Sequence, residues 1–151
     1  MLGKLARWLR ILGYSVDFLT NREDHEILSH CKQFSRILLT GDAELFRRAS
    51  NMNLTTHLVS VHDSVSHQLA KLSKKYSLEL IPNVEDSRCS VCDGQLHPIP
   101  RSAALGLVPT TSYSIYDQFW RCSNCGKTYW QGGHWIKILK VFEEAKRLAN
   151  S

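Results

Sequence analysis

The sequence predicts an α/β fold with a parallel sheet, followed by a small cysteine-rich module and a closing helix. Short apolar runs alternate with amphipathic stretches three times in the first half, and parallel strands need a helical crossover between them. Four of the five cysteines then fall in two Cys-x-x-Cys pairs, and an apolar-periodic segment ends the chain. We therefore expect an α/β domain over residues 1–83 and a second domain over residues 84–151.

The first element expected is an amphipathic helix in the segment LGKLARWLRILGY. Apolar side chains recur at helical spacing, at Leu2, Leu5, Leu9 and Leu12. Another face of the same helix carries the basic side chains Lys4, Arg7 and Arg10. Gly13 stands where a helix would end.

The α/β part continues as strand and helix patterns in alternation. SVDFL (residues 15–19), RILLT (36–40) and THLVSV (56–61) are short β-rich or apolar runs, each followed by a helical pattern. RILLT is a continuous apolar run of the kind found in parallel strands buried on both faces. LELIP (78–82) is a further strand candidate.

The two cysteine pairs are Cys89 with Cys92 and Cys122 with Cys125. Thiolates at this spacing share a metal ion in a reducing compartment. Four thiolates complete a tetrahedron and leave no position for water, so we predict a structural zinc ion. An iron–sulfur cluster on the same ligands, or four unrelated buried cysteines, are the alternatives. The long intervening segment fits a zinc ribbon, with strands expected at residues 118–121 and 128–131 and a helix at 136–149.

Charge and hydropathy indicate a protein of the cytoplasm with no membrane partner. The net charge is +5, and residues 87–151 hold 8 basic and 4 acidic side chains. No stretch approaches the roughly 18 consecutive apolar residues that a membrane span needs. The basic surplus favours RNA as partner, although an ordinary solvated charged face explains it equally well.

Three carboxylates are candidates for a catalytic metal site. Asp42 directly follows RILLT, and ligands gather at the carboxyl ends of parallel strands. Asp24 and Glu26 open the preceding predicted helix. Such carboxylates hold Mg²⁺ or Mn²⁺ for phosphodiester hydrolysis. The alternative is helix capping, which Asp24 and Asp42 would also satisfy.

Taken together, MLGKLARWLRILGY, RILLTGD, the two cysteine pairs and CGKTYWQGGHW resemble the Mut-7 C-terminal RNase domain family. The resemblance implies a PIN-like nuclease core, a three-layer α/β/α arrangement, fused to a zinc ribbon and a C-terminal helix. It also implies that Asp42, Asp24 and Glu26 hold the catalytic metal and that Lys4, Arg7 and Arg10 lie near phosphate.

This sequence departs from the family pattern at two places. Family members begin with a short hydrophobic strand that ends in an aspartate, just ahead of the Leu-Gly-x-Leu-Ala segment, and that strand is not in this sequence. Either the true start lies further upstream, or the fold has rearranged and catalysis is lost. In addition, Gly41 stands where the family often has arginine, which removes one phosphate contact.

The aromatic residues near the second cysteine pair have two interpretations. Tyr129, Trp130, His134 and Trp135 could pack the ribbon against the core, or could stack on unpaired bases beside Lys127 and Lys137. Two hypotheses about function follow. The chain is a Mg²⁺- or Mn²⁺-dependent ribonuclease, or it is a non-catalytic zinc-ribbon protein that binds RNA or ribosomal particles.

Overall fold

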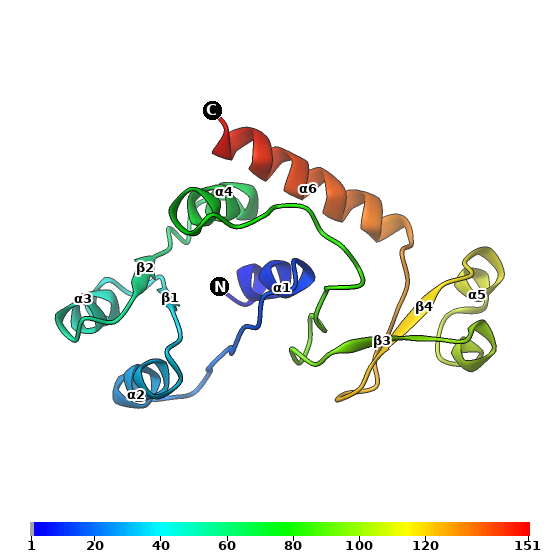
Figure 1. Ribbon diagram of the computed structural model, residues 1–151, viewed down its shortest axis with the longest axis horizontal. Helices are drawn as coiled ribbons and strands as arrows, with labels where there is room; N and C mark the ends of the chain where they lie inside the picture. Colours follow the sequence, from blue (N-terminus) through cyan, green and yellow to red (C-terminus); the bar gives the residue numbers. More distant parts are fainter. Residues whose placement is uncertain (1) are drawn as a thin grey trace.

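The structure is a computed structural model that describes residues 2–151, and it combines a small parallel sheet with a separate antiparallel sheet (Figure 1). The N-terminal elements are α1 (Gly3–Ile11), α2 (Asp24–Phe34), β1 (Leu38–Thr40), α3 (Ala43–Asn51), β2 (Thr56–Leu58) and α4 (Val65–Tyr76). The C-terminal elements are β3 (Leu96–Ile99), the 3₁₀ turn η1 (Arg101–Ala104), α5 (Thr110–Ile115), β4 (Phe119–Cys122), β5 (Thr128–Tyr129) and α6 (Gly133–Ala149). The mixed α/β class predicted from the sequence is confirmed.

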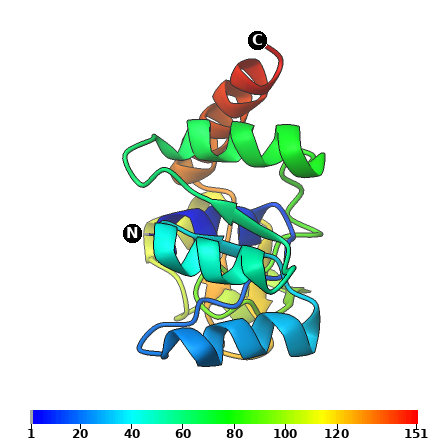
Figure 2. The same cartoon turned by 90° about the vertical axis from the view of Figure 1, so that its left-hand side faces the viewer.

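The parallel sheet consists of β1 and β2, joined by the crossover helix α3. Leu38 pairs with Thr56 and Thr40 pairs with Leu58. The hydroxyl of Thr56 also donates to the carbonyl of Leu38, over 3.1 Å. α4 and α2 lie on opposite sides of these strands (Figure 2). Two of the predicted strands, RILLT and THLVSV, are thus present in shortened form.

The strand predicted at residues 15–19 is wrong, because this segment is neither strand nor helix. Its backbone groups bond to side chains instead of to a neighbouring strand. The Val16 N–H donates to a carboxylate oxygen of Asp93 over 2.9 Å, and the Val16 carbonyl accepts from the Arg10 guanidinium over 2.7 Å. The β-rich composition therefore produced an extended segment that is held by partners distant in the sequence.

The strand candidate at residues 78–82 is also irregular in the structure. The carbonyl of Leu78 accepts from the hydroxyl of Ser73 over 2.7 Å, so part of its backbone bonds back to the end of α4. Leu80 nevertheless points into the core, with 4% of its surface exposed. The apolar run is used for packing and not for sheet pairing.

The largest core lies between α1, α4 and α6. Leu5, Leu9, Leu69, Leu72 and Phe142 are buried there together. The ring of Trp8 on α1 meets the ring of Phe142 on α6 edge to face, with 5.2 Å between their centroids. The last helix therefore packs against the first part of the chain, whereas the division at residue 83 remains a prediction.

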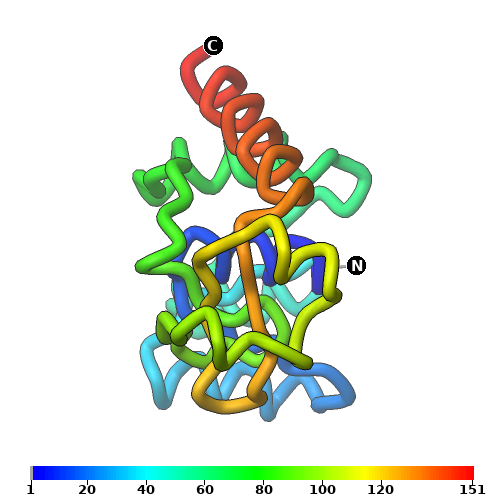
Figure 3. The backbone as a smooth tube through the Cα atoms, turned by 90° about the vertical axis from the view of Figure 1, so that its right-hand side faces the viewer, coloured from blue at the N-terminus to red at the C-terminus, as the bar shows by residue number. Residues whose placement is uncertain are grey.

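The antiparallel sheet has the order β3-β4-β5 and lies at the opposite end of the molecule from α2 and α3. Two of its strands match the predicted positions, and β3 had no prediction. Its own small core contains Ala104, Val108 and Phe119. The segment with η1 and α5 loops out from this end, and the chain then runs from β5 up into α6 (Figure 3). In residues 2–151 no helix combines the length and the apolar character required for a membrane crossing.

Candidate functional site

The four sulfur atoms of Cys89, Cys92, Cys122 and Cys125 lie within 4.8 Å of one another. The sulfurs of Cys89 and Cys125 are 3.6 Å apart, and those of Cys92 and Cys122 are 3.4 Å apart. A tetrahedron with zinc–sulfur bonds of about 2.3 Å has edges of roughly 3.8 Å, so these spacings suit one ion in the centre. Cys122 ends β4, and Cys125 lies in the turn between β4 and β5.

Gly94 shows that the backbone is closely fitted around the sulfurs. A Cβ atom at this position would lie 2.6 Å from the sulfur of Cys122 and 3.2 Å from that of Cys92. Any side chain larger than hydrogen would therefore push two of the ligands out of position. The closeness of Gly94 to the sulfurs could not be predicted from the sequence, because Cys122 lies 28 positions further along the chain.

Hydrogen-bond donors surround the sulfurs, as expected for thiolates. The backbone N–H groups of Asn124 and Cys125 point to the sulfur of Cys122, at 3.4 and 3.5 Å. The hydroxyl of Tyr129 lies 2.9 Å from the sulfur of Cys89 and 3.2 Å from the hydroxyl of Ser90. A hydrogen bond from the side chain of Asn124 is the main reason that the pKa of Cys92 falls to about 6. This donor set fits a bound divalent metal ion.

A buried ion pair joins the first cysteine pair to α1. The guanidinium of Arg10 lies 3.4 Å from a carboxylate oxygen of Asp93, and the two side chains are 9% and 14% exposed. Arg10 also donates to the carbonyls of Ser90 (3.1 Å) and Val16 (2.7 Å). Asp93 in turn accepts from the hydroxyl of Ser15 over 2.8 Å. The cysteine loop, α1 and the segment after α1 therefore form one hydrogen-bonded unit.

The buried position of Arg10 beside Asp93 changes the interpretation of the basic face of α1. Arg10 is 7% exposed and its guanidinium bonds inside the protein, which does not favour the predicted contact with nucleic acid. Lys4 and Arg7 are exposed, as are Lys127 and Lys137 in the C-terminal part. These four residues remain predicted RNA contacts. Sequence spacing could not separate Arg10 from Arg7, because the partner, Asp93, is distant in the chain.

The three predicted catalytic carboxylates lie at the starts of α2 and α3. Asp42 caps α3, with one carboxylate oxygen accepting from the N–H groups of Glu44 (2.9 Å) and Leu45 (3.2 Å). Glu26 accepts from the N–H of Glu23 in a capping box. Asp42 therefore performs the capping role that the sequence left open as the alternative. Glu26 also takes part in a cap, but the N-cap residue of α2 is Glu23 and not Asp24.

Asp24 forms an ion pair with Arg48, whose nitrogen lies 3.2 Å from the Asp24 carboxylate. Because Arg48 belongs to α3, this pair draws the acidic start of α2 toward the helix that Asp42 caps. Within residues 2–151, the four cysteines form the one group of three or more His, Cys, Asp or Glu ligand atoms close enough to share a metal. The catalytic role of Asp24, Glu26 and Asp42 therefore stays a prediction.

The aromatic residues beside the second cysteine pair pack within the module. The ring of Trp130 lies 6.4 Å from Phe119 and 6.1 Å from His134, between ring centroids. Tyr129 contacts the cysteine cluster, and the ammonium group of Lys127 lies 5.1 Å from the centre of its ring. These contacts favour the packing interpretation over stacking on bases.

Comparison with known protein families gives a match that covers most of the chain. A model of the Mut7-C RNAse domain matches residues 1–142, which includes α1, the carboxylates at the starts of α2 and α3, and all four cysteines. Comparisons with curated proteins and with solved structures give no match. Because the matched region covers nearly all of the chain, this protein belongs to the Mut7-C RNAse domain family.

Proposed function

We propose that this protein is a metal-dependent endoribonuclease with a PIN-like, three-layer α/β/α core. In this proposal the core is residues 1–83, and residues 84–151 form a zinc ribbon with a C-terminal helix that engages RNA. The observation that carries the proposal is the family match over residues 1–142, which suggests a ribonuclease. Asp42 supports it further, because it lies at the carboxyl end of a parallel strand, where ligands bind in such sheets.

The proposed catalytic metal is Mg²⁺ or Mn²⁺, held by Asp42, Asp24 and Glu26. When bound, such an ion polarises the scissile phosphate and lowers the pKa of a water molecule. The Asp24–Arg48 pair would orient the start of α2 toward Asp42. Free oxygens on the carboxylates remain for a metal, since Asp42 caps α3 with only one of its two oxygens.

The proposed zinc ion is structural and is held by Cys89, Cys92, Cys122 and Cys125. Its four thiolates would leave no open coordination position for chemistry. The exposed cations Lys4, Arg7, Lys127 and Lys137 are proposed to contact phosphates of the RNA. Each such contact contributes to a salt-dependent affinity, whatever the base sequence.

The test is cleavage of single-stranded and structured RNA with Mn²⁺ or Mg²⁺, comparing the wild type with Asp42→Asn. Asparagine keeps the helix cap, because its side-chain oxygen accepts the same two N–H groups. Loss of activity by roughly 100-fold or more with unchanged helix content would support a metal-binding role. Arg47→Met, which removes an exposed side chain on the same helix, is the control. Equal activity of Asp42→Asn and wild type would contradict the proposal.

A second candidate function is RNA binding without cleavage, on ribosomal particles or on free RNA. The observation that favours it is the engagement of all three carboxylates in helix caps or an ion pair. In that case wild type and Asp42→Asn both lack nuclease activity but bind RNA. The logarithm of their affinity should fall by roughly 0.7–0.9 per phosphate contact for each unit of log salt. Salt-independent binding would exclude this function.

A further inference from the structure

An open trough of about 640 Å³ runs along α1 on the side that carries its exposed cations. Lys4, Arg7 and Trp8 of α1 line it, together with Phe18 from the segment after α1. Ser90 of the cysteine loop and Ile138 of α6 complete the lining on the C-terminal side of the chain. The trough therefore brings two cations and two aromatic rings to one surface, to which both halves of the chain contribute.

The two cations of the trough have no carboxylate partner within residues 2–151. Lys4 and Arg7 are exposed, and the ion pairs of the described chain include neither of them. The described residues that line the trough contain no aspartate or glutamate. Arg10 of the same helix differs, because its charge is paired with Asp93. The trough therefore presents two uncompensated positive charges, which favour an anionic ligand.

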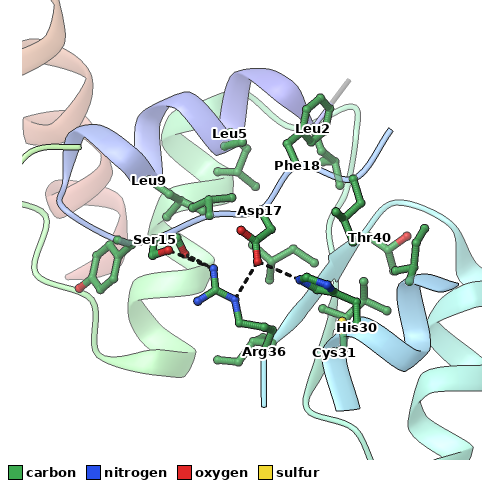
Figure 4. A pocket seen from close by; sticks show the side chains of 18 of the residues that line it. Leu2, Leu5, Leu9, Ser15, Asp17, Phe18, His30, Cys31, Arg36 and Thr40 are labelled. Atoms are coloured by element: carbon green, nitrogen blue, oxygen red, sulfur yellow. Dashed lines mark hydrogen bonds and ion pairs between the residues drawn. The ribbon is translucent and has the colours of Figure 1, made fainter. Parts of the chain in front are cut away.

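Phe18 gives the trough an aromatic surface that is held in place. Its side chain is 47% exposed, and a Cβ atom on Gly3 would lie 3.3 Å from its ring, so the ring lies close against the start of α1. A carboxylate oxygen of the neighbouring Asp17 lies 2.9 Å from Nε2 of His30 and 3.3 Å from Nε of Arg36, as Figure 4 shows. These contacts fix the main chain beside the ring before a ligand binds, which lowers the entropy cost of binding.

We propose that this trough binds unpaired RNA, with one base stacked on the ring of Phe18 and the flanking phosphates beside Lys4 and Arg7. The proposal rests on RNA as the proposed substrate and adds the site that holds a single-stranded segment of it. The exposed ring decides the class of anion. The face of an aromatic ring carries partial negative charge and repels a carboxylate, whereas a nucleobase stacks on it. Bases inside a duplex are already stacked on their neighbours and have no free face for the ring.

The first experiment measures fluorescence anisotropy of labelled octauridylate, an RNA without secondary structure. Every protein carries Asp42→Asn, so that the probe is not cleaved. Phe18→Leu keeps an apolar side chain and removes the ring, and we expect the dissociation constant to rise roughly fivefold or more. Phe18→Trp should retain the affinity. Phe34→Leu is the matched control, because Phe34 is 56% exposed and does not line the trough. Equal affinities of Phe18→Leu and Phe34→Leu, or no binding by the parent protein, would overturn the proposal.

The second experiment replaces the probe by an abasic ribose-phosphate octamer, which has the same charge and no bases. The parent protein should bind it more weakly than octauridylate, and Phe18→Leu should bind it as well as the parent does. An equal loss of affinity for both probes in Phe18→Leu would mean that the ring acts only through the structure of the protein, and would overturn the stacking proposal. Circular dichroism checks that each variant folds.

The third experiment separates the phosphate contacts from stacking by their salt dependence. Lys4→Gln and Arg7→Gln should each reduce the slope of log affinity against log salt by roughly 0.7, whereas Phe18→Leu should leave the slope unchanged. Unchanged slopes in both glutamine variants would overturn the position of the phosphates. Cleavage is measured separately on wild type and Asp42→Asn. A chain that binds octauridylate through Phe18 but cleaves no RNA would contradict the proposed nuclease and support the binding site.

Discussion

The buried pair of Arg10 and Asp93 makes a quantitative prediction about stability. Arg10→Met keeps much of the side-chain volume and removes the guanidinium from a site where it is 9% exposed. Its loss leaves the carboxylate of Asp93 buried beside one remaining cation, Arg88, at 3.3 Å. Removing one partner of a buried ion pair costs about 3–5 kcal/mol. Because Arg88 remains, we expect a value near the lower end, about 3 kcal/mol.

The assay is urea unfolding followed by tryptophan fluorescence, together with a thermal melt. For a chain of this size, about 3 kcal/mol corresponds to a lower melting temperature by roughly 6–12 °C. Arg10→Met should destabilise both the packing of α1 and the cysteine loop, because Arg10 of α1 donates to the carbonyl of Ser90, which lies between Cys89 and Cys92. Release of metal to a chromophoric chelator should therefore also be faster in Arg10→Met.

Asp93→Asn is the matched variant for a double-mutant cycle. Asparagine can still accept from the N–H of Val16 and tolerates the positive φ of 69° at this position, so it should cost less than Arg10→Met. The double variant contains no unpaired buried charge. Its loss of unfolding free energy should therefore be smaller than the sum of the two single-variant losses by about 1–2 kcal/mol. A loss below about 1 kcal/mol for Arg10→Met, or strictly additive losses, would refute the argument.

Four further predictions follow from other sites. Gly94→Ala should weaken zinc binding in a competition titration, because its Cβ meets the sulfur of Cys122, whereas Gly133→Ala has open space and should not. Removal of the metal by a chelator should expose the amides of β3 to β5 to hydrogen exchange and leave those of α4 protected, since zinc contributes roughly 10–16 kcal/mol to such modules. Asp42→Ala should lower stability in urea by about 1 kcal/mol through loss of the cap, and Asp42→Asn should not. Burial, followed in effect by the Lys75 and Lys71 charges, lowers the pKa of His57 below its usual 6.5. The stability that neutral His57 contributes is therefore complete above about pH 6.5 and is lost as the pH falls through the lowered pKa. The urea midpoint of His57→Gln should depend less on pH than that of the wild type in this acidic range.

The sequence predicted five of the six α-helices of residues 2–151, because their signals are local, whereas α5 had no prediction. The apolar spacing in α1 and the capping residues of α2 and α3 lie within one or two turns of each helix. The cysteine cluster was predictable for a similar reason, since the spacing within each pair limits the geometry.

The failures concern partners that are distant in the chain. Residues 15–19 have the composition of a strand, yet Val16 bonds to Asp93, which lies 77 positions away. Arg10 resembles Arg7 in the helical pattern, and only the fold distinguishes the buried side chain from the exposed one. No periodicity within a segment contains that information.

The packing of α6 has a consequence for synthesis on the ribosome. Phe142 belongs to the core of α1 and α4, so that core is incomplete until residues 133–149 have left the exit tunnel. The four cysteines emerge before this helix does. With the proposed zinc ion, the module would acquire its ion while the N-terminal half still lacks its closing helix, and cellular zinc supply would become a determinant of folding order.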